Sequence, residues 1–396
     1  MKAILILNAG SSSLKFALFP MTPRLADLPQ LSGQVEGIGA EPMMHARDNH
    51  SGERFTEALA VPEGADQNGQ HRNALEFVFD WIRRHSPGVE IVAAGHRIVH
   101  GGDHYSGPVM LTPDAVGTLE TLIPLAPLHQ PHNLRAIKSL FTLMPEVRQV
   151  GCFDTSFHRT RHPVAARFPL PRALFDEGIK RYGFHGLSYE YIARALPQHS
   201  GRATGRVVVA HLGNGASMAA MVDRKCVATT LGFSTIDGLV MGTRCGNLDP
   251  GVILHLMETK NLSVKDMTKM LYKESGLLGV SGLSQDMRTL LASDKPEAGE
   301  AVNLFCYRIA RELGSLAAAA GGLDALVFTG GIGEHAAEVR RRVCLQSEWL
   351  GIRVNPEANA RHELRISAGN SSVDVLVIPT NEEWMMAHHA QTLLAL

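Results

Sequence analysis

The strongest constraint on the fold is a repeat: an apolar run, a turn rich in Asn, Gly and Ser, and a second apolar run occur twice. In the first copy, apolar residues 3–7 and 16–19 flank the turn NAGSSS. The second copy starts about 200 residues later, with VVVAH at 207–211, the turn LGNGAS and the run MAAMV, and an apolar stretch over 226–231 follows it. Short apolar runs bounded by Gly and Ser predict strands. The repeat therefore predicts a duplicated architecture with one polar turn in each half.

Gly-rich turns also follow two other predicted strands, IVAAGHRIVHGG at 91–102 and ALVFTGGIGEH at 325–335. Ligands of α/β proteins bind at strand ends, where such turns lie. Glycine allows positive φ and a close approach of the backbone, so successive N–H groups can converge on an anion. A single Gly/Ser turn is usually only a hairpin loop, but several in one chain favour phosphate binding. The sequence contains no GxxxxGK[ST] segment, which excludes a P-loop as the phosphate site.

Helices are predicted between the strands. Apolar residues spaced i, i+3, i+4 and i+7 predict a helix over 72–84. Ser263 with Asp266 predicts the start of another helix, and Ser188 is expected to cap a third. Residues 40–71 are polar, with scattered Gly, Asn and Pro, and predict an irregular surface segment.

Two arginines stand in or beside glycine-rich turns: Arg97 at the end of a predicted strand and Arg244 inside GTRCG. A lone arginine is usually a solvated surface residue, but at such a place its planar fork suits a carboxylate or phosphate. Asp154 and Glu382 each follow a predicted buried strand, and isolated acids of this kind can hold Mg²⁺ together with nucleotide phosphates. His185 lies in a turn beside apolar residues, and no His or Cys spacing in the sequence indicates zinc.

Size and composition limit the function further. A chain of 396 residues is long enough for two domains, with a cleft between them as the natural binding place. A net charge of −1 argues against binding to nucleic acid or to an anionic membrane. Five cysteines without a CxxC pair predict reduced thiols and a cytoplasmic protein. We expect no signal peptide, because Asn8 and Lys15 interrupt the first short apolar run. We expect no membrane span, because no apolar run reaches about 18 residues.

Taken together, the motifs resemble those of the acetokinase family over essentially the whole chain. In the family's order they are NAGSSSLKF, GHRIVHGG, APLHQPHN, CFDTSFH, YGFHGLS, HLGNGAS, MGTRCGNLDPG, GGIGE and TNEE. The resemblance implies an α/β fold of two duplicated ribonuclease H-like domains around a central cleft, as in the actin-like ATPases. It assigns residues 1–154 plus 385–396 to an acyl-substrate domain and residues 155–384 to a nucleotide-binding domain.

The same resemblance implies reversible transfer of the γ-phosphoryl group of ATP to acetate, giving acetyl phosphate and ADP, by a homodimer that uses Mg²⁺ or Mn²⁺. The implied catalytic residues are Asp154, Arg97, Arg244 and His185, and the implied metal ligands are Asn8 and Glu382. The implied nucleotide site consists of His211, Leu212, Gly213, Asn214, Gly215, Asp286, Met287, Arg288, Gly331, Ile332, Gly333, Glu334 and His335, together with Ser11, Ser13 and Lys15 of the first turn. The implied acyl-substrate residues are Arg97, Val99, Leu128 and Thr235.

Three positions depart from the family pattern. Tyr189 replaces the second histidine of HGTSH, His335 replaces the asparagine of GIGEN, and Thr235 stands where the acyl pocket has a proline. The change at Thr235 leaves a propionate or butyrate kinase open as an alternative. A nucleotide-dependent binding machine like the Hsp70 ATPase is a second alternative, although such a protein needs no arginine placed for a small carboxylate.

The implied reaction needs no general base, because a carboxylic acid with a pKa near about 4.3 is already ionised at pH 7. Its difficulty is repulsion between the anionic acceptor and the triphosphate. Our hypothesis is that Arg97 orients acetate, Arg244 holds the transferring phosphoryl group and His185 donates to it. Asp154 and the two metal ligands would then place the cation.

Overall fold

The computed structural model describes residues 1–61, 64 and 66–395, and the chain divides into two compact units. The first unit contains Met1–Ser156 and Asn381–Leu396, and the second contains Phe157–Thr380. The boundaries expected from the sequence placed residues 155–156 and 381–384 with the second unit instead. The difference at the C-terminal crossing arises because helix α15 (Glu382–Leu393) starts at Glu382 and packs against the first sheet.

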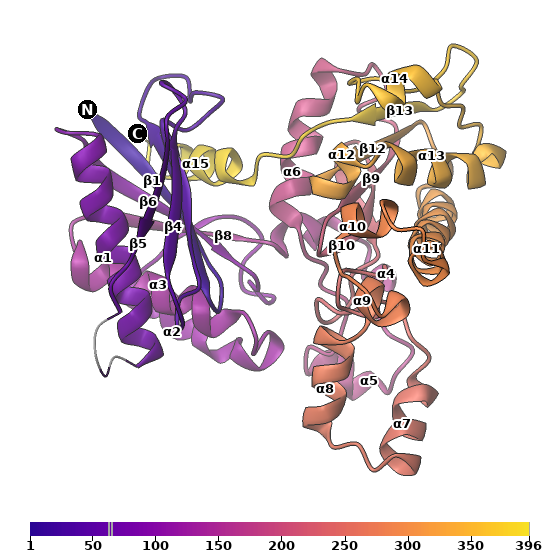
Figure 1. The fold of residues 1–396 in the computed structure, drawn as a ribbon, viewed down its shortest axis with the longest axis horizontal. Coiled ribbons are helices and arrows are strands. Elements are labelled where there is room, and N and C mark those ends of the chain that lie inside the picture. Colours follow the sequence, from indigo (N-terminus) through magenta and orange to yellow (C-terminus); the bar gives the residue numbers. More distant parts are fainter. Residues whose placement is uncertain (62–63, 65, 396) are drawn as a thin grey trace. The chain divides into compact units, whose positions relative to one another are not determined.

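Within the described residues, the first unit is built on an eight-stranded sheet with the order β5-β4-β3-β2-β1-β6-β8-β7 (Figure 1). Its strands are β1 (Lys2–Ala9), β2 (Ser13–Pro20), β3 (Leu31–Glu36), β4 (Met43–Asp48), β5 (Arg54–Ala58), β6 (Glu90–Ile98), β7 (Val109–Met110) and β8 (Arg148–Phe153). The predicted hairpin is confirmed, because β1 pairs antiparallel with β2 and the Gly10 amide donates to the Ser13 carbonyl at 2.8 Å. On the other side, β1 runs parallel to β6, and β6 runs parallel to β8.

The second unit contains a five-stranded sheet with the order β11-β10-β9-β12-β13. Its strands are β9 (Arg206–Leu212), β10 (Ala216–Val222), β11 (Lys225–Thr229), β12 (Ala325–Thr329) and β13 (Asp374–Val377). The first three pair antiparallel, while β12 runs parallel to both β9 and β13. The first sheet has the same order and the same directions in β3-β2-β1-β6-β8. The predicted duplication is therefore confirmed at the level of strand order.

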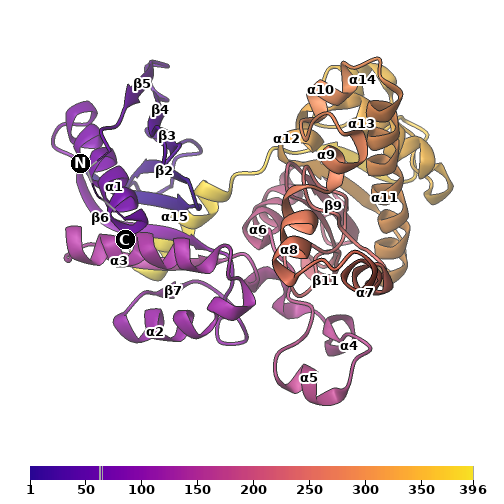
Figure 2. The same ribbon diagram turned by 60° about the horizontal axis from the view of Figure 1, so that its bottom comes forward.

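Helices cover both faces of each sheet. The first unit has α1 (Gln67–His85), α2 (Pro113–Thr121), α3 (Gln130–Leu143) and α15. The second unit has α4 (Pro163–Ala166), α5 (Arg172–Asp176), α6 (Gly186–Ala195), α7 (Pro250–Thr259), α8 (Val264–Lys273), α9 (Gly276–Ser281), α10 (Met287–Leu291), α11 (Pro296–Ala320), α12 (Gly330–His335), α13 (Ala337–Gln346) and α14 (Pro356–Ala360). Figure 1 and Figure 2 both show α6 and α11 on opposite sides of β9.

The helix predicted over 72–84 is confirmed within α1. Its apolar stripe, which includes Leu75, Val78 and Ile82, is buried against strand residues such as Leu5 and Phe16. The capping box at the start of α8 is confirmed as well: Ser263 accepts from the Asp266 amide, and the Asp266 carboxylate accepts from the Ser263 amide. Among the described helices, none is both long and apolar enough to span a membrane.

Two expectations are wrong. Residues 40–71 contain β4, β5 and the start of α1 instead of an irregular segment, with residues 62, 63 and 65 outside the described part. The polar composition misled because several side chains of β4 and all those of β5 are exposed or only partly buried, so these strands need few apolar residues. Ser188 does not cap α6, because His185 stands at the N-cap in the left-handed conformation with φ 58°. Ser188 instead lies in the first helical turn and contacts His211.

Candidate active site

Arg97 and Asp154 form a two-point ion pair in the first unit. Arg97 lies on β6 opposite Cys152 of β8, and Asp154 follows the last residue of β8, so the sheet brings both side chains to neighbouring strand ends. The Arg97 Nε atom donates to Asp154 Oδ1 at 3.0 Å, and Nη2 donates to Oδ2 at 2.7 Å. Asp154 is only 1% exposed, whereas 22% of the Arg97 side chain is exposed. The structure thus joins two of the four predicted catalytic residues.

The electrostatics of this pair keep Arg97 charged. Burial lowers the pKa of the Arg97 guanidinium, but Asp154 and Glu382 raise it by more, so the net pKa lies above its ordinary value. Within the described residues, the Nη1 atom has no hydrogen-bond partner, because Nε and Nη2 carry the contacts to Asp154. A cation with one free donor end in a half-buried place suits a small carboxylate.

The predicted metal ligands lie near this pair. Glu382 opens α15, and Asn8 of β1 pairs in register with Lys15 of β2. Burial and the Glu382 charge raise the pKa of the adjacent Glu383, while Lys15 opposes them. In the part of the chain that the structure describes, no three His, Cys, Asp or Glu side chains gather as a metal site. Mg²⁺ usually takes only one or two protein carboxylates with phosphates and waters, so a Glu382 carboxylate with an Asn8 amide fits that pattern.

The remaining predicted residues of the first unit have varied environments. Ser11 is exposed, and its carbonyl is 3.0 Å from His71 Nε2. Ser13 begins β2 directly after the turn. Val99 is buried and its amide donates to Asn133 Oδ1 at 3.0 Å, whereas Leu128 is 42% exposed.

His185 belongs to a cluster of polar side chains in the second unit. On β9 and β10, His211 and Ser217 are paired in register, so their side chains lie on one face of the sheet. Helix α6 packs against β9 and places His185 over both. The His185 Nδ1 atom is 2.8 Å from Ser217 Oγ, and its ring stacks on that of His211 with centroids 4.4 Å apart. Ser188 Oγ in turn lies 2.8 Å from His211 Nδ1.

Arg244 lies beside this histidine. A Cβ atom added to Gly215 would be 3.5 Å from His185 Nε2 and 3.9 Å from Arg244 Nη1, so the three residues converge. The Arg244 Nη1 atom also donates to the Thr235 carbonyl at 2.8 Å. The structure therefore brings His185, Arg244 and the turn that contains Gly215 together, with the Thr235 carbonyl as an acceptor for Arg244. The imidazole and guanidinium N–H groups suit an anion.

A pocket of about 480 Å³ lies in the same unit. Its lining includes the predicted residues Gly213, Asn214, Asp286, Met287, Arg288, Gly331, Ile332 and His335. Hydrogen bonds from Arg288 to Asp286 lower the pKa of that carboxyl to about 2, so it is ionised at neutral pH. Three further lining residues, Gln285, Leu291 and Ala336, were not predicted. Each lies next to a predicted segment or one helical turn beyond it. This proximity in sequence could have predicted them.

Other predicted nucleotide residues do not line this pocket. Leu212 is fully buried, and the Gly333 carbonyl accepts from Arg340 Nη1 at 2.8 Å. Glu334 Oε1 accepts from the Gly330 amide at 2.8 Å and from the Thr380 amide at 3.3 Å. These contacts make Glu334 a support of the turn after β12.

Ser217 is a site residue that the sequence did not single out. It lies within the motif HLGNGAS, but only the pairing of β9 with β10 shows that its hydroxyl faces His185.

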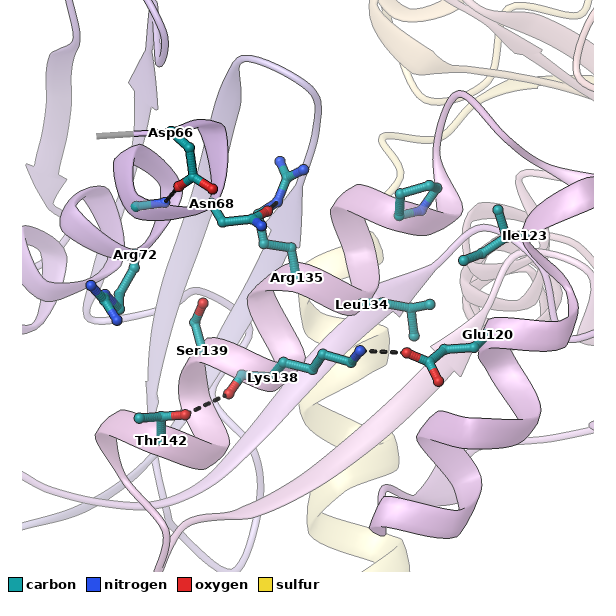
Figure 3. Close-up of a pocket in the computed structure, with 12 residues that line it drawn as sticks. Asp66, Asn68, Arg72, Glu120, Ile123, Leu134, Arg135, Lys138, Ser139 and Thr142 are labelled. Atoms are coloured by element: carbon teal, nitrogen blue, oxygen red, sulfur yellow. Dashed lines mark hydrogen bonds and ion pairs between the residues drawn. The ribbon is translucent and has the colours of Figure 1, made fainter. Parts of the chain in front are cut away.

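A second pocket, of about 510 Å³, lies in the first unit and contains none of the predicted site residues. It is lined mainly by α1, α3 and the end of α2 (Figure 3). Figure 3 shows Lys138 reaching Glu120 and Arg135 directed toward Asn68, so these two cations have partners within the pocket.

Comparison with known proteins decides the family. The sequence matches the model of the acetokinase family over residues 3–388. The chain belongs to the acetokinase family.

Relatives and solved structures agree with this assignment. An acetate kinase of Rhodopseudomonas palustris strain TIE-1 is 54% identical over 98% of this chain and 97% of its own. An acetate kinase of Methylocella silvestris is 49% identical over 99% and 98%. The crystal structure of an acetate kinase from Porphyromonas gingivalis aligns over the whole of both chains at 37% identity, with a TM-score of 0.89. A propionate kinase from Francisella tularensis aligns over 99% of this chain and all of its own at 36% identity, with a TM-score of 0.90. The expected two-domain actin-like fold is therefore confirmed.

Proposed function

We propose that this chain transfers the γ-phosphoryl group of ATP to acetate, giving acetyl phosphate and ADP, and that it catalyses the reverse reaction. The observation that carries this proposal is the match to acetate kinases at 54% identity over nearly the full length. The two side-chain clusters support it, because each offers cations or hydrogen-bond donors suited to anions.

The reaction needs those donors more than it needs a base. Acetate is ionised at pH 7, so no proton has to be removed before it attacks. Two anions must instead be brought together, and negative charge spreads over the equatorial oxygens of the transferring group. Fixed cations and donors lower this barrier by electrostatic stabilisation.

The geometry of each unit supports the following residue roles. Arg97 Nη1 binds the acetate carboxylate, while the ion pair with Asp154 fixes the guanidinium plane. Arg244 binds the transferring phosphoryl group, and His185 donates a hydrogen bond to one of its oxygens. Val99 limits the size of the acyl group.

A divalent cation, Mg²⁺ or Mn²⁺, is part of the proposal. Glu382 and Asn8 would hold it, and it would neutralise charge on the β- and γ-phosphate oxygens. The Glu382 carboxylate and the Asn8 amide supply the oxygen ligands that such hard ions prefer.

We assign the nucleotide to the second unit and acetate to the first. Most residues that line the pocket beside Gly213 and Asp286 were predicted as nucleotide-binding residues. Its volume of about 480 Å³ is in the range of small-molecule sites. The adenosine part would bind there. Arg97 lies in the first unit, which makes that unit the acyl-substrate side.

The proposal extends to a homodimer in the cytoplasm. Within the described residues none of the five cysteines forms a disulfide, in keeping with a reducing compartment. Size-exclusion chromatography with light scattering would measure the oligomeric state, and a monomeric mass would contradict the dimer.

A hydroxamate assay tests the activity. ATP, Mg²⁺ and acetate should give acyl phosphate, and no acyl phosphate with slow ATP hydrolysis would favour a nucleotide-dependent machine. A propionate kinase is the second candidate, because Thr235 departs from the family pattern. The similarity to the Francisella propionate kinase is consistent with this candidate but does not favour it. One added methylene typically costs about 1 to 3 kcal/mol in an apolar pocket, so kcat/KM should fall from acetate to propionate to butyrate. A maximum at propionate would support the second candidate.

A further inference from the structure

Tyr189, Ser217 and His185 form a chain of hydrogen bonds in the second unit. The Tyr189 hydroxyl is 2.5 Å from Ser217 Oγ, and Ser217 Oγ is 2.8 Å from His185 Nδ1. Tyr189 and Ser217 are fully buried. Hydrogen bonds shielded from water in this way have well-defined partners, and their direction determines where protons lie.

The protein holds the phenol ring of Tyr189 in a fixed place. Tyr189 lies four residues after His185, the N-cap residue of α6, and both side chains reach Ser217 Oγ. Its ring stacks on Phe157 with centroids 6.1 Å apart and meets the edge of His158 at 5.6 Å. This packing directs the Tyr189 hydroxyl at Ser217. The family pattern has a histidine at the position of Tyr189.

The chemistry of the three groups sets the direction of the hydrogen bonds. A phenol, with a pKa near about 10, is a better donor than an aliphatic hydroxyl, so Tyr189 donates to Ser217 Oγ. Serine has a single hydroxyl proton, which Ser217 then donates to His185 Nδ1. A neutral imidazole that accepts at Nδ1 carries its proton on Nε2.

The Nε2 side of His185 faces the site. A Cβ atom at residue 215 would lie 3.5 Å from this nitrogen and 3.9 Å from Arg244 Nη1. A proton on Nε2 therefore stands next to the guanidinium, where two donors can act on one anion.

We propose that Tyr189, acting through Ser217, keeps the ring proton of His185 on Nε2 and so holds a donor ready for the transferring phosphoryl group. This role rests on the proposed function. Tyr189 and Ser217 are positioning residues, since only His185 contacts the phosphoryl oxygen. In the opposite arrangement, Nδ1 donates to Ser217 and Nε2 presents a lone pair that repels the phosphoryl group.

Steady-state kinetics of three variants test the chain of hydrogen bonds. Tyr189→Phe removes only the hydroxyl and should lower kcat about 10- to 100-fold, by analogy with the removal of partners that orient metal-binding histidines. KM for acetate and ATP should stay within about twofold, because ground-state binding does not use this proton. Ser217→Ala should lower kcat at least as much, and the double variant should be no slower than Ser217→Ala, because Tyr189 acts through Ser217. Additive losses would overturn the proposal.

Two further variants separate positioning from packing. Tyr191→Phe removes a hydroxyl from the same helix and should keep wild-type kcat. Tyr189→His restores a donor and should recover turnover relative to Tyr189→Phe. Equal losses in Tyr189→Phe and Tyr191→Phe would reduce Tyr189 to a packing residue and overturn the proposal.

The proton itself can be observed by ¹⁵N NMR of histidine side chains in the wild-type protein, with His185→Gln identifying the signals. The expected spectrum has a protonated Nε2, and a protonated Nδ1 overturns the proposal whatever the kinetics of the Tyr189 and Ser217 variants. Failure of the proposed function is distinguishable: the wild type would then form no acyl phosphate, or His185→Ala would keep near-normal turnover. Turnover that requires His185 but is unchanged in Tyr189→Phe and Ser217→Ala would contradict the positioning role alone.

Discussion

The two units share one strand order but hold their site arginines in different ways. In the first unit, Arg97 is part of β6 and is fixed by strand pairing and by the buried carboxylate of Asp154. In the second, Arg244 lies in a loop and donates to the Thr235 carbonyl. That loop is compact: a Cβ atom would come within 2.8 Å of the Thr230 carbonyl at Gly238.

The two arginines are held in place by different kinds of contact. Arg97 depends on an opposite charge, so its position and the stability of the first unit are coupled. Arg244 lies in a loop with close backbone contacts and donates to a neutral backbone carbonyl. The duplicated sheets thus carry one arginine that is paired with a buried carboxylate and one that contacts a backbone carbonyl.

The largest expected effect is the loss of the Arg244 charge. Arg244→Ala should lower kcat on the order of 10³-fold, as for other arginines that stabilise a transferring phosphoryl group. The free energy of unfolding of Arg244→Ala shows how much of this loss comes from weakened folding. Steady-state assays and urea unfolding measure both quantities. Near-normal turnover would refute the assigned role.

Breaking the ion pair of the first unit should have the next largest effect. Asp154→Asn leaves the Arg97 charge without its buried partner, and removing one member of such a pair typically costs about 3 to 5 kcal/mol. Because Arg97 is 22% exposed, we expect about 3 kcal/mol in the free energy of unfolding, together with a loss of turnover.

A matched variant in the second unit sharpens this result. Asp237 pairs with Arg181 at 3.1 Å, and about a quarter of each side chain is exposed. Asp237→Asn should cost less than about 1 kcal/mol, as for other solvated pairs. Equal losses of unfolding free energy in Asp154→Asn and Asp237→Asn would show that burial of Asp154 does not make the first ion pair more stabilising than the second.

Buried histidines give a pH-dependent comparison between the units. Burial, with a contribution from Arg161, lowers the pKa of His158 in the second unit to about 3, and burial lowers that of His96 in the first to about 4. Below pH 6.5 the unfolded chain binds a proton that the folded protein does not. Their stabilising effect is therefore complete above pH 6.5 and is lost as the pH falls toward the folded pKa.

Two variants test whether the free energy of unfolding falls with pH in this direction. His158→Gln keeps a donor for the Phe184 carbonyl, which His158 Nε2 reaches at 2.9 Å, but cannot titrate. Between pH 6 and pH 4, the free energy of unfolding of the wild type should fall more steeply than that of the variant, by about 1.4 kcal/mol per pH unit. His96→Gln should show the same difference down to about pH 4. His255 is exposed, so His255→Gln provides the control. If His158→Gln or His96→Gln changed the pH dependence of the free energy of unfolding no more than His255→Gln does, the lowered pKa values of the buried histidines would be contradicted.

Much of the fold was predictable because its signals are local. The repeated strand–turn–strand unit gave the hairpins and the duplication, and Gly-rich strand ends gave most of the pocket lining around Gly213, Asp286 and Gly331. Such signals depend on neighbours in sequence, which a single chain displays.

The rest depends on contacts between distant residues. Nothing in the sequence shows that a histidine takes positive φ, so the start of α6 at His185 was missed. The role of Ser217 depends on its pairing with His211 across two strands. Strands β4 and β5 were missed because their polar side chains face water, a pattern that resembles a loop until the neighbouring strands are known.

The smallest expected effect is the loss of a helix cap outside both sites. It shows how much a small loss of stability changes turnover. Ser263→Ala removes the capping box of α8 in the second unit and should cost about 1 kcal/mol in the free energy of unfolding, with kcat unchanged. Thr112→Ala, which removes the cap of α2 in the first unit, should cost a similar amount, because Thr112 Oγ1 accepts from the Ala115 amide at 3.2 Å. If either cap variant lost turnover in proportion to stability, the decline in Arg244→Ala could be attributed to weakened folding. Unchanged turnover in both would show that each unit tolerates a loss of this size, so the large kinetic effect at Arg244 would belong to its charge.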